Sequence, residues 1–493
     1  MPAMTDGRRG GFSRTVRAAL LLVLMAGFYV LALAIVAALA SLFVIQAKTD
    51  MHIPGIVLIA AVIGIVSIVI GIVPRYQEFI QPGPRITREQ QPQLFDEIRR
   101  VAEATGSPMP REVYIVAQVN AAVAHVGGWL GIGSRPIMML GLPLIAVLRV
   151  SELRGVIAHE FGHFVGGETR LSTVIYRTRE GIGRTIGTLE RSVHWMSRGI
   201  RYPFIWYGEM YLRLTQAQSR QQELDADAMA ARIAGGTSME SGLVAIEAAG
   251  LVYDTYLNSE VGVVVGAGFR PPLAEGFSRF LEAADVVTTI HEAARSATRP
   301  DPSHPYDGHP SLGARLSALR DAPHRSAPDP DPPAIELVRD TSGLEGELLR
   351  WMTSPGLDGL QPIGWVDAPQ KAWLPFWERQ CGAAREALRG VTPASLPDQH
   401  WSPGTAPPGA EGMPWGALVG AALAVLLASR GWSIEGLPGD PVTATRDGTI
   451  IEPFTVVERL ATGELSAEAW RTVCRGADIT EIDLGTLAGD GVA

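Results

Sequence analysis

The stretch 158–163 reads AHEFGH and contains an H-E-x-x-H pattern. On a helix, residues four apart lie one turn above each other on the same face, so His159 and His163 can direct imidazole nitrogens at one cation. Glu160 lies about 100° further round the helix axis, where it is badly placed as a ligand but can take a proton from a water beside the cation. This spacing is typical of a zinc-binding helix. A helix that contains these residues by chance is the competing interpretation.

The residues around the pattern predict a buried helix. Ser151 is a plausible N-cap, residues 152–165 follow as the helix, and Gly166 with Gly167 ends it. Apolar residues lie on both sides of the histidine face, so the imidazoles should be held by packing. Buried histidines without a partner are costly, which favours a bound cation.

Composition limits the alternatives. The chain has 493 residues, room for two or three domains, and a net charge of -9 without a concentration of Lys and Arg, so we expect no nucleic-acid partner. Cys381 and Cys474 are far apart and form no C-x-x-C pattern, which argues against a disulfide framework and a thiolate zinc site. Any metal must be held by histidine and carboxylate.

Two long apolar runs near the N-terminus predict a transmembrane hairpin. Residues 18–45 carry no charge, and residues 56–73 contain Ser67 as their one polar side chain. Arginines precede the first run and follow the second, whereas the connecting loop offers only Lys48. By the positive-inside rule, both ends of the hairpin face the cytoplasm.

A cleaved signal peptide is the alternative for the first run, because arginines precede it and residues 38–40 (Ala-Leu-Ala) resemble a cleavage site. The apolar region before that site exceeds the usual length of a signal peptide, and a second apolar run follows. Both observations favour the hairpin.

The region after the membrane predicts an amphipathic helix at 93–104 and strands at 112–119 and 136–140, which together suggest a small antiparallel sheet. Residues 195–214 mix aromatic side chains with arginines and are too charged for a confident span. They fit a segment at the lipid headgroups or a plain packed helical pair, and we do not count them as a span.

A catalytic zinc needs a third protein ligand. The H-E-x-x-H-x-x-G-x-x-H solution is excluded because Thr169 occupies the last position. The other solution is a glutamate on a second helix, followed one turn later by an aspartate. Between residues 165 and 260 only Glu223 has an aspartate at that spacing, Asp227. Glu223 is therefore the predicted ligand, and Asp227 is predicted to orient a ligand imidazole.

These residues, with the hairpin before them, resemble the gluzincin family of the heat-shock protease HtpX and the CAAX prenyl endopeptidases, over roughly residues 91–319. The matching pieces are Asn120-Ala121-Ala122, MMLGLPLIAVL at 138–148, SELRGVIAHEFGH at 151–163, ELDAD at 223–227, and His309-Pro310-Ser311 followed by Arg315.

The resemblance implies an integral-membrane zinc metalloendopeptidase with a zincin-like α+β catalytic domain, one zinc ion and its site on the cytoplasmic side. It also implies that His309 and Arg315 contribute to catalysis, by steadying the oxyanion beside the base Glu160. The substrate chain is expected to pair as a strand along Asn120, Ala121 and Ala122. HtpX-type proteins usually have more than two apolar spans, and the last 170 residues or so have no counterpart.

The expected fold is mainly α with this small sheet, behind the transmembrane hairpin, and with a separate C-terminal domain that is α/β or mostly α. The C-terminal domain should open with a buried helix from Trp415, contain a hairpin around Asp447-Gly448 and end in two helices. The predicted units are 1–80 (tail and hairpin), 81–322 (metallopeptidase), 323–334 (Pro-rich linker), 335–390 (helical extension), 391–414 (linker) and 415–493 (C-terminal domain).

The predicted function is hydrolysis of peptide bonds at the inner or plasma membrane, in quality control of misfolded membrane proteins. The expected partners are polypeptide substrates and the lipid bilayer, with an oligomer possible. One alternative is a membrane-anchored interaction protein with a structural zinc site. Another is the processing of one membrane-associated peptide or prenylated protein, although two helices are too few to build a lipid-sized chamber.

Overall fold

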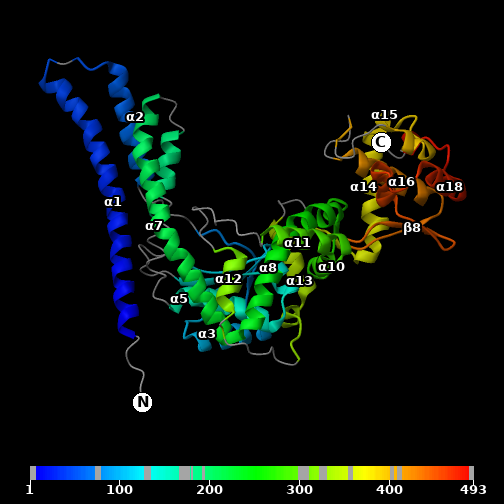
Figure 1. Cartoon of the computed structure of the whole chain (residues 1–493), viewed down its shortest axis with the longest axis horizontal. Helices are drawn as coiled ribbons and strands as arrows, with labels where there is room; N and C mark the ends of the chain where they lie inside the picture. Colours follow the sequence, from blue (N-terminus) through cyan, green and yellow to red (C-terminus); the bar gives the residue numbers. More distant parts are fainter. Residues whose placement is uncertain are drawn as a thin grey trace.

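The computed structural model describes residues 7–50, 52–72, 79–126, 135–165, 178, 181–190, 195–297, 310–320, 322, 330–352, 359–399, 405–407 and 413–487. Figure 1 shows a pair of long N-terminal helices, a central body of helices around a small sheet, and a second helical body near the C-terminus. The prediction of a mainly α chain with a small sheet behind two apolar helices is confirmed.

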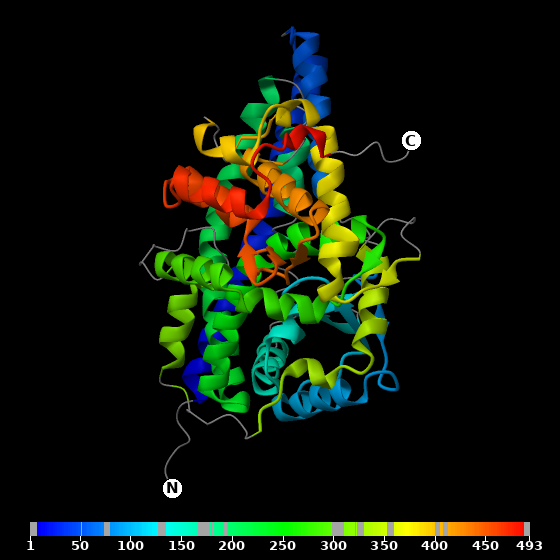
Figure 2. The ribbon, with the colours of Figure 1, turned by 90° about the vertical axis from the view of Figure 1, so that its right-hand side faces the viewer.

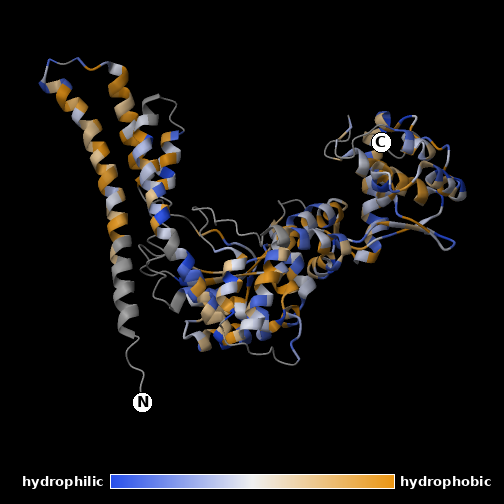
Figure 3. Ribbon diagram, viewed as in Figure 1, coloured by the Kyte–Doolittle hydropathy of each residue, from blue (hydrophilic) through white to orange (hydrophobic). Residues whose placement is uncertain are grey.

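The two apolar runs form α1 (Gly7–Lys48) and α2 (Gly55–Ile72). The part of α1 from Leu22 onward and the whole of α2 are long and apolar enough to cross a membrane, and Figure 3 shows them coloured largely as hydrophobic. Outward side chains such as Leu33 and Ile59 are 65% and 60% exposed. An apolar surface of this extent fits lipid better than water.

A second helical pair packs against this hairpin. Residues 181–190 are helical, and α7 (Trp195–Ala234) begins beside the hairpin and continues into the central body (Figure 1). Residues 195–214 thus belong to a packed helical pair, which is one of the two interpretations of this segment, and their contact with lipid headgroups stays a prediction. The buried cluster that joins the four segments comprises Leu24, Phe28, Ala32, Ile68, Ile182, Leu189, Phe204, Tyr207 and Tyr211.

The central body contains a four-stranded sheet in the order β1-β2-β4-β3. β2 and β4 are parallel, so the prediction of an antiparallel sheet is wrong for this pair, although β3 and β4 are antiparallel. The reason is that β3 runs opposite to β2, and β4 returns in the direction of β2 and inserts between them. The strands are β1 (Arg85–Ile86), β2 (Glu112–Val116), β3 (Ala121–Val126) and β4 (Arg135–Gly141).

Gly141 fastens the turn between β2 and β3 to the end of β4. Its N–H donates to the Asn120 carbonyl at 2.8 Å. A Cβ at this position would overlap the carbonyl oxygen of Gln118, so only glycine permits the close approach. The contact sets where β3 begins.

The first hydrophobic core lies between this sheet and the helices of the central body. The predicted amphipathic helix is α3 (Pro92–Thr105), which buries Leu94, Ile98 and Val101 and ends at Gly106 with φ 70°. The other helices that contribute to the core are α4 (Leu142–Val147), α5 (Val150–Val165), α7, α8 (Gly236–Tyr256), α12 (Leu312–Leu319) and α13 (Thr341–Met352).

The second hydrophobic core surrounds α16 (Trp415–Ser429), in which every residue from 418 to 427 is buried, as predicted. The predicted hairpin is formed by β8 (Thr443–Arg446) and β9 (Thr449–Ile451), with Asp447 and Gly448 at positive φ. Figure 2 shows the molecule turned so that this C-terminal body faces the viewer. Its other elements are α14 (Leu374–Ala383), α15 (Arg385–Leu388), β7 (Ser433–Glu435), α17 (Pro453–Thr462) and α18 (Ala467–Ala477).

The two cores divide the chain differently from the predicted units. The second core includes buried residues between 249 and 280 from the predicted metallopeptidase unit, and the first core includes Ala334 from the predicted linker and buried residues between 338 and 348 from the predicted extension. α8 contributes to both cores, and it continues through a π-helix, Leu257–Val261, into α9 (Gly262–Gly266). Two further helices follow, α10 (Leu273–Glu282) and α11 (Ala284–Ala297), with β5 (Phe269–Arg270) paired to β6 (Gln361–Pro362).

Candidate metal centre

α5 and α7 carry the predicted ligands and approach each other closely. Gly162 of α5 faces Ala226 of α7, and a Cβ on Gly162 would lie only 3.1 Å from the Cα of Ala226. A glycine opposite an alanine therefore brings the two helix axes together. The other side of α5 is anchored in the first core by Leu153, Ile157 and Phe161, which are at most 1% exposed.

His159, His163 and Glu223 bring together three ligand atoms that all lie within 4.8 Å of one another. The two Nε2 atoms are 3.3 Å apart, and the Glu223 oxygens are 3.5 Å from His159 Nε2 and 3.9 Å from His163 Nε2. Zinc holds N and O ligands at about 2.0–2.2 Å in a tetrahedron, which separates the ligand atoms by roughly 3.3–3.6 Å. The donor set and its spacing fit a zinc ion.

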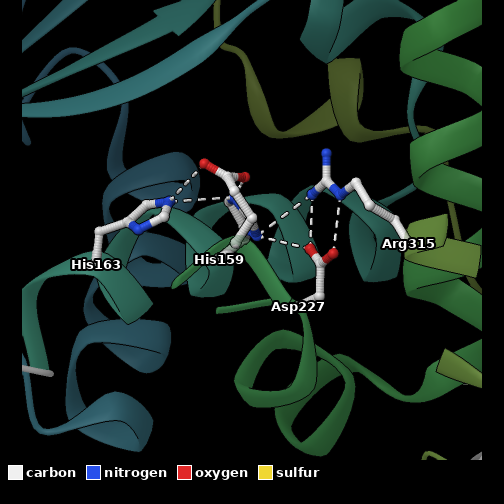
Figure 4. A network of polar contacts seen from close by, with 5 residues as sticks. His159, His163, Asp227 and Arg315 are labelled. Carbon is white, nitrogen blue, oxygen red and sulfur yellow. Dashed lines mark hydrogen bonds and ion pairs between the residues drawn. The ribbon is translucent and has the colours of Figure 1, made fainter. Parts of the chain in front are cut away.

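Asp227 and Arg315 lie on the Nδ1 side of the His159 ring, whereas Glu223 lies on its Nε2 side (Figure 4). His159 Nδ1 lies 2.8 Å from Asp227 Oδ1, and Arg315 donates to both Asp227 oxygens, at 2.6 Å from Nη2 and 2.8 Å from Nε. Burial opposes ionisation, but the hydrogen bonds from Arg315 and His159 outweigh it and hold the pKa of Asp227 below its usual value. This carboxylate fixes the orientation of the imidazole that faces Glu223.

Burial and neighbouring charges in the metal centre shift the pKa values of two further groups, His159 and Glu160. Burial alone would lower the pKa of His159, but its hydrogen bonds to Asp227 and Glu223 raise the pKa to about 9. Burial raises the pKa of Glu160 to about 7, with nearby His159 acting against this and Glu223 adding to it. A concentration of perturbed pKa values is typical of a functional site.

Glu160 lies beside the edge strand of the sheet. The backbone of Val123 in β3 lies near its carboxyl group and favours the ionised form, which lowers the pKa of Glu160. β3 pairs with β4 on one side, and it is the last strand in the order of the described sheet. Among the predicted substrate-binding residues, Ala121 and Ala122 lie in β3 and Asn120 directly precedes it.

The first turn of α5 is held by groups that the sequence did not indicate. α5 begins at Val150, so Ser151 lies inside it and the prediction of an N-cap there is wrong. The Ser151 N–H donates to Asp331 Oδ1 at 3.0 Å, and Glu152 Oε2 accepts the Arg149 N–H at 2.8 Å. The Asp331 carboxylate, 180 residues away in the chain, therefore accepts a hydrogen bond from an N–H group in the first turn of α5, and its negative charge complements the helix dipole.

The structure brings five of the predicted site residues together: His159, Glu160, His163, Glu223 and Asp227. Arg315 joins them through Asp227, and α12 presents it from beside α7 and α8. His309 lies outside the described residues. Sequence reasoning missed the contributions of Val123, whose backbone N–H acts independently of its side chain, and of Asp331, which has no periodic or spacing signal.

Comparisons with known proteins agree with this geometry. The family model described as Peptidase family M48 matches residues 88–322. Curated proteins called Protease HtpX homolog, from Tropheryma whipplei strains Twist and TW08/27, are each 32% identical over 111 residues, which are 22% of this chain and 37% of the relative. The chain thus spans little more than a third of the length of the curated relatives that it matches.

The matched region contains every described residue of the metal centre and agrees with the extent, 91–319, over which the residues resemble HtpX-type proteins. The predicted resemblance is confirmed. Residues 88–322 of this chain match the model of peptidase family M48.

Proposed function

We propose that the chain is an integral-membrane zinc metalloendopeptidase that binds one zinc ion through His159, His163 and Glu223. The observation that carries the proposal is the convergence of these three ligand atoms from α5 and α7. The carboxyl group of Glu160, which follows His159 on α5, lies near enough to interact electrostatically with His159 and Glu223. The group found among the described residues offers three ligands. Three protein ligands and one open position are characteristic of catalytic zinc sites, whereas structural sites are closed by four.

Each residue has a role in peptide hydrolysis. Bound zinc would polarise the scissile carbonyl and lower the pKa of a water molecule to about 7. Glu160 can take a proton from a water molecule at the site and deliver it to the leaving amine. Asp227, held by Arg315, keeps His159 oriented. His309 remains a candidate for steadying the oxyanion, on the strength of the family resemblance.

The edge strand β3 supports binding of an extended substrate. Because the backbone of Val123 in β3 lies near the Glu160 carboxyl group, a polypeptide that pairs with this edge would pass close to the reacting groups. We assign Asn120, Ala121 and Ala122 to this binding edge. Recognition through the backbone tolerates many sequences, which suits the removal of misfolded membrane proteins.

We further propose that the hairpin spans the cell membrane with both of its ends, and hence the metal centre, on the cytoplasmic side. The arginines at positions 8, 9, 14 and 17 and those at 75, 85 and 88 flank the hairpin, and the connecting loop carries Lys48 alone. Oligomerisation is compatible with this arrangement.

The test replaces the proposed base. Glu160→Gln should lower the cleavage of casein in detergent by about 100-fold or more while zinc content stays stoichiometric, because Gln keeps the shape but cannot accept a proton. Glu103→Gln, at an exposed side chain of α3, is the matched control and should leave cleavage unchanged.

Unchanged turnover in Glu160→Gln would overturn the protease proposal. Retention of zinc by a protein that shows no cleavage in either form would favour the alternative, a membrane-anchored interaction protein in which the zinc joins α5 to α7.

A further inference from the structure

α7 joins the membrane hairpin to the metal centre as one continuous helix of 40 residues. Tyr211 belongs to the buried cluster shared with the hairpin, and Glu223 is a ligand of the metal centre. The internal proline, Pro203, precedes both of them. The segment between Tyr211 and Glu223 is therefore regular helix, and Figure 1 shows α7 passing from beside α2 into the central body.

The first part of α7 lies at the same depth as the apolar spans. Gly64 is the tenth residue of the 18-residue helix α2, and a Cβ there would be only 2.9 Å from Ile200 Cδ1 of α7. Nearer the central body, the Tyr207 hydroxyl donates to the Leu24 carbonyl, and Tyr211 lies one further turn toward the N-terminal end of the uncharged run 18–45 of α1. The level of Tyr207 to Tyr211 therefore marks the membrane boundary nearest the metal centre.

The side chains on this part of α7 suit a lipid environment. Tyr202 and Trp206, one turn apart, are 67% and 65% exposed, and large aromatic rings are favoured near the interface between lipid and water. Arg201 donates through Nη1 to Glu190 at 2.7 Å, so these two charges are paired with each other. The segment can accompany the hairpin into the bilayer without being apolar enough to count as a span by composition.

Twelve residues separate Tyr211 from Glu223, which at about 1.5 Å per residue is about 18 Å of helix. We propose that this segment of α7 is a spacer that sets the distance between the bilayer and the metal centre. The inference rests on the proposed function, which already names membrane proteins as substrates, and adds one requirement to it: cleavage needs a minimum length of chain between the membrane anchor and the scissile bond. An extended chain covers about 3.3 Å per residue, so this minimum is about six residues.

The experiment reconstitutes the full chain in vesicles of phosphatidylethanolamine and phosphatidylglycerol. The substrates carry one apolar helix, a Gly/Ser linker of 2 to 20 residues and one common cleavable sequence. Cleavage should be absent at 2 residues, rise at least 10-fold between 2 and about 8, and then level off. Equal cleavage at every linker length would overturn the spacer.

A soluble peptide with the same cleavable sequence separates this failure from failure of the proposed function. If the wild type and Glu160→Gln treat that peptide alike, the protease proposal fails. If only the wild type cleaves it, the protease proposal holds, and the linker series then tests only the proposal that α7 is a spacer.

A second experiment increases the distance between the bilayer and the metal centre. Insertion of seven helix-forming residues between Leu214 and Thr215 adds about two turns, or roughly 10 Å, and should raise the minimum linker by about three residues. The same insertion in the Asp447-Gly448 turn is the control and should leave the minimum unchanged. An unchanged minimum in a spacer variant that still binds zinc and cleaves the soluble peptide would overturn the proposal. If the insertion variant does not bind zinc, the spacer proposal is tested by the linker series with the wild type instead.

Discussion

Asp227 connects the predicted zinc ligand His159 to Arg315. It is 1% exposed, its Oδ1 faces His159 Nδ1, and both of its oxygens accept hydrogen bonds from Arg315. A buried carboxylate without such partners would be costly. Arg315 therefore acts on the metal centre through Asp227, and we interpret it as a positioning residue in place of the oxyanion role that the family resemblance implies.

Arg315→Lys tests this role. Lysine keeps the charge but cannot form the two parallel hydrogen bonds, so His159 should lose its fixed orientation. We expect zinc affinity, measured by competition with a chelator, to fall about 10- to 100-fold. Arg232→Lys, at an exposed position of α7, is the control. Unchanged zinc affinity with a lowered turnover number would instead support the oxyanion role.

At the scale of elements, the close approach of α5 and α7 determines whether the three ligand atoms meet. The spacing of His159 and His163 within one helix, and of Glu223 and Asp227 within another, was readable from the sequence because helical periodicity is local. The alanines around Ala226 indicate a helix that can approach another closely, but that Gly162 is the residue opposite Ala226 is a contact between distant segments, which periodicity does not encode. The start of α5 likewise depends on Asp331, a contact that only the folded chain creates.

Gly162→Leu should separate the two helices. The new side chain would overlap Ala226, and overpacking of this kind costs about 1–3 kcal/mol in the free energy of unfolding. We expect a lower thermal midpoint together with loss of bound zinc, measured on the same preparation. Gly250→Leu on α8, where a Cβ has open space, is the matched control. Full zinc content in Gly162→Leu would show that the approach of α5 and α7 is not limiting.

At the scale of the whole molecule, α8 and the π-helix after it join the two cores. Glu260 lies in that π-helix and accepts a hydrogen bond from the backbone of Gly439 in the C-terminal body. Burial raises the pKa of Glu260 from 4.5 to about 7, and the hydrogen bonds from Gly439 and Ser259 offset this only in part. The folded chain therefore binds a proton here that the unfolded chain has released at pH 6.

The sign of this effect predicts how stability depends on pH. The contribution of Glu260 is fully present below about pH 4.5 and is lost as the pH rises through about 7, because the folded state binds the proton more tightly. Each pKa unit corresponds to about 1.4 kcal/mol, so the loss between these two pKa values is on the order of 3–4 kcal/mol.

Glu260→Gln should remove this dependence. Its thermal midpoint, relative to the wild type, should rise between pH 5 and pH 8. Glu282→Gln, at an exposed position at the end of α10, should follow the wild type throughout. Parallel curves for Glu260→Gln and the wild type would contradict the assignment.

The sequence by itself determined the features that depend on local spacing: the two apolar helices, the zinc helix, Glu223 and Asp227 as partners, and the C-terminal hairpin at Asp447-Gly448. Only the tertiary structure decided the order and direction of the strands, the division into two cores, the attachment of Arg315 to Asp227, and the packing of α7 along the hairpin. These features depend on contacts between residues far apart in the chain. Such contacts follow from the shape and packing of whole elements, which periodicity does not encode.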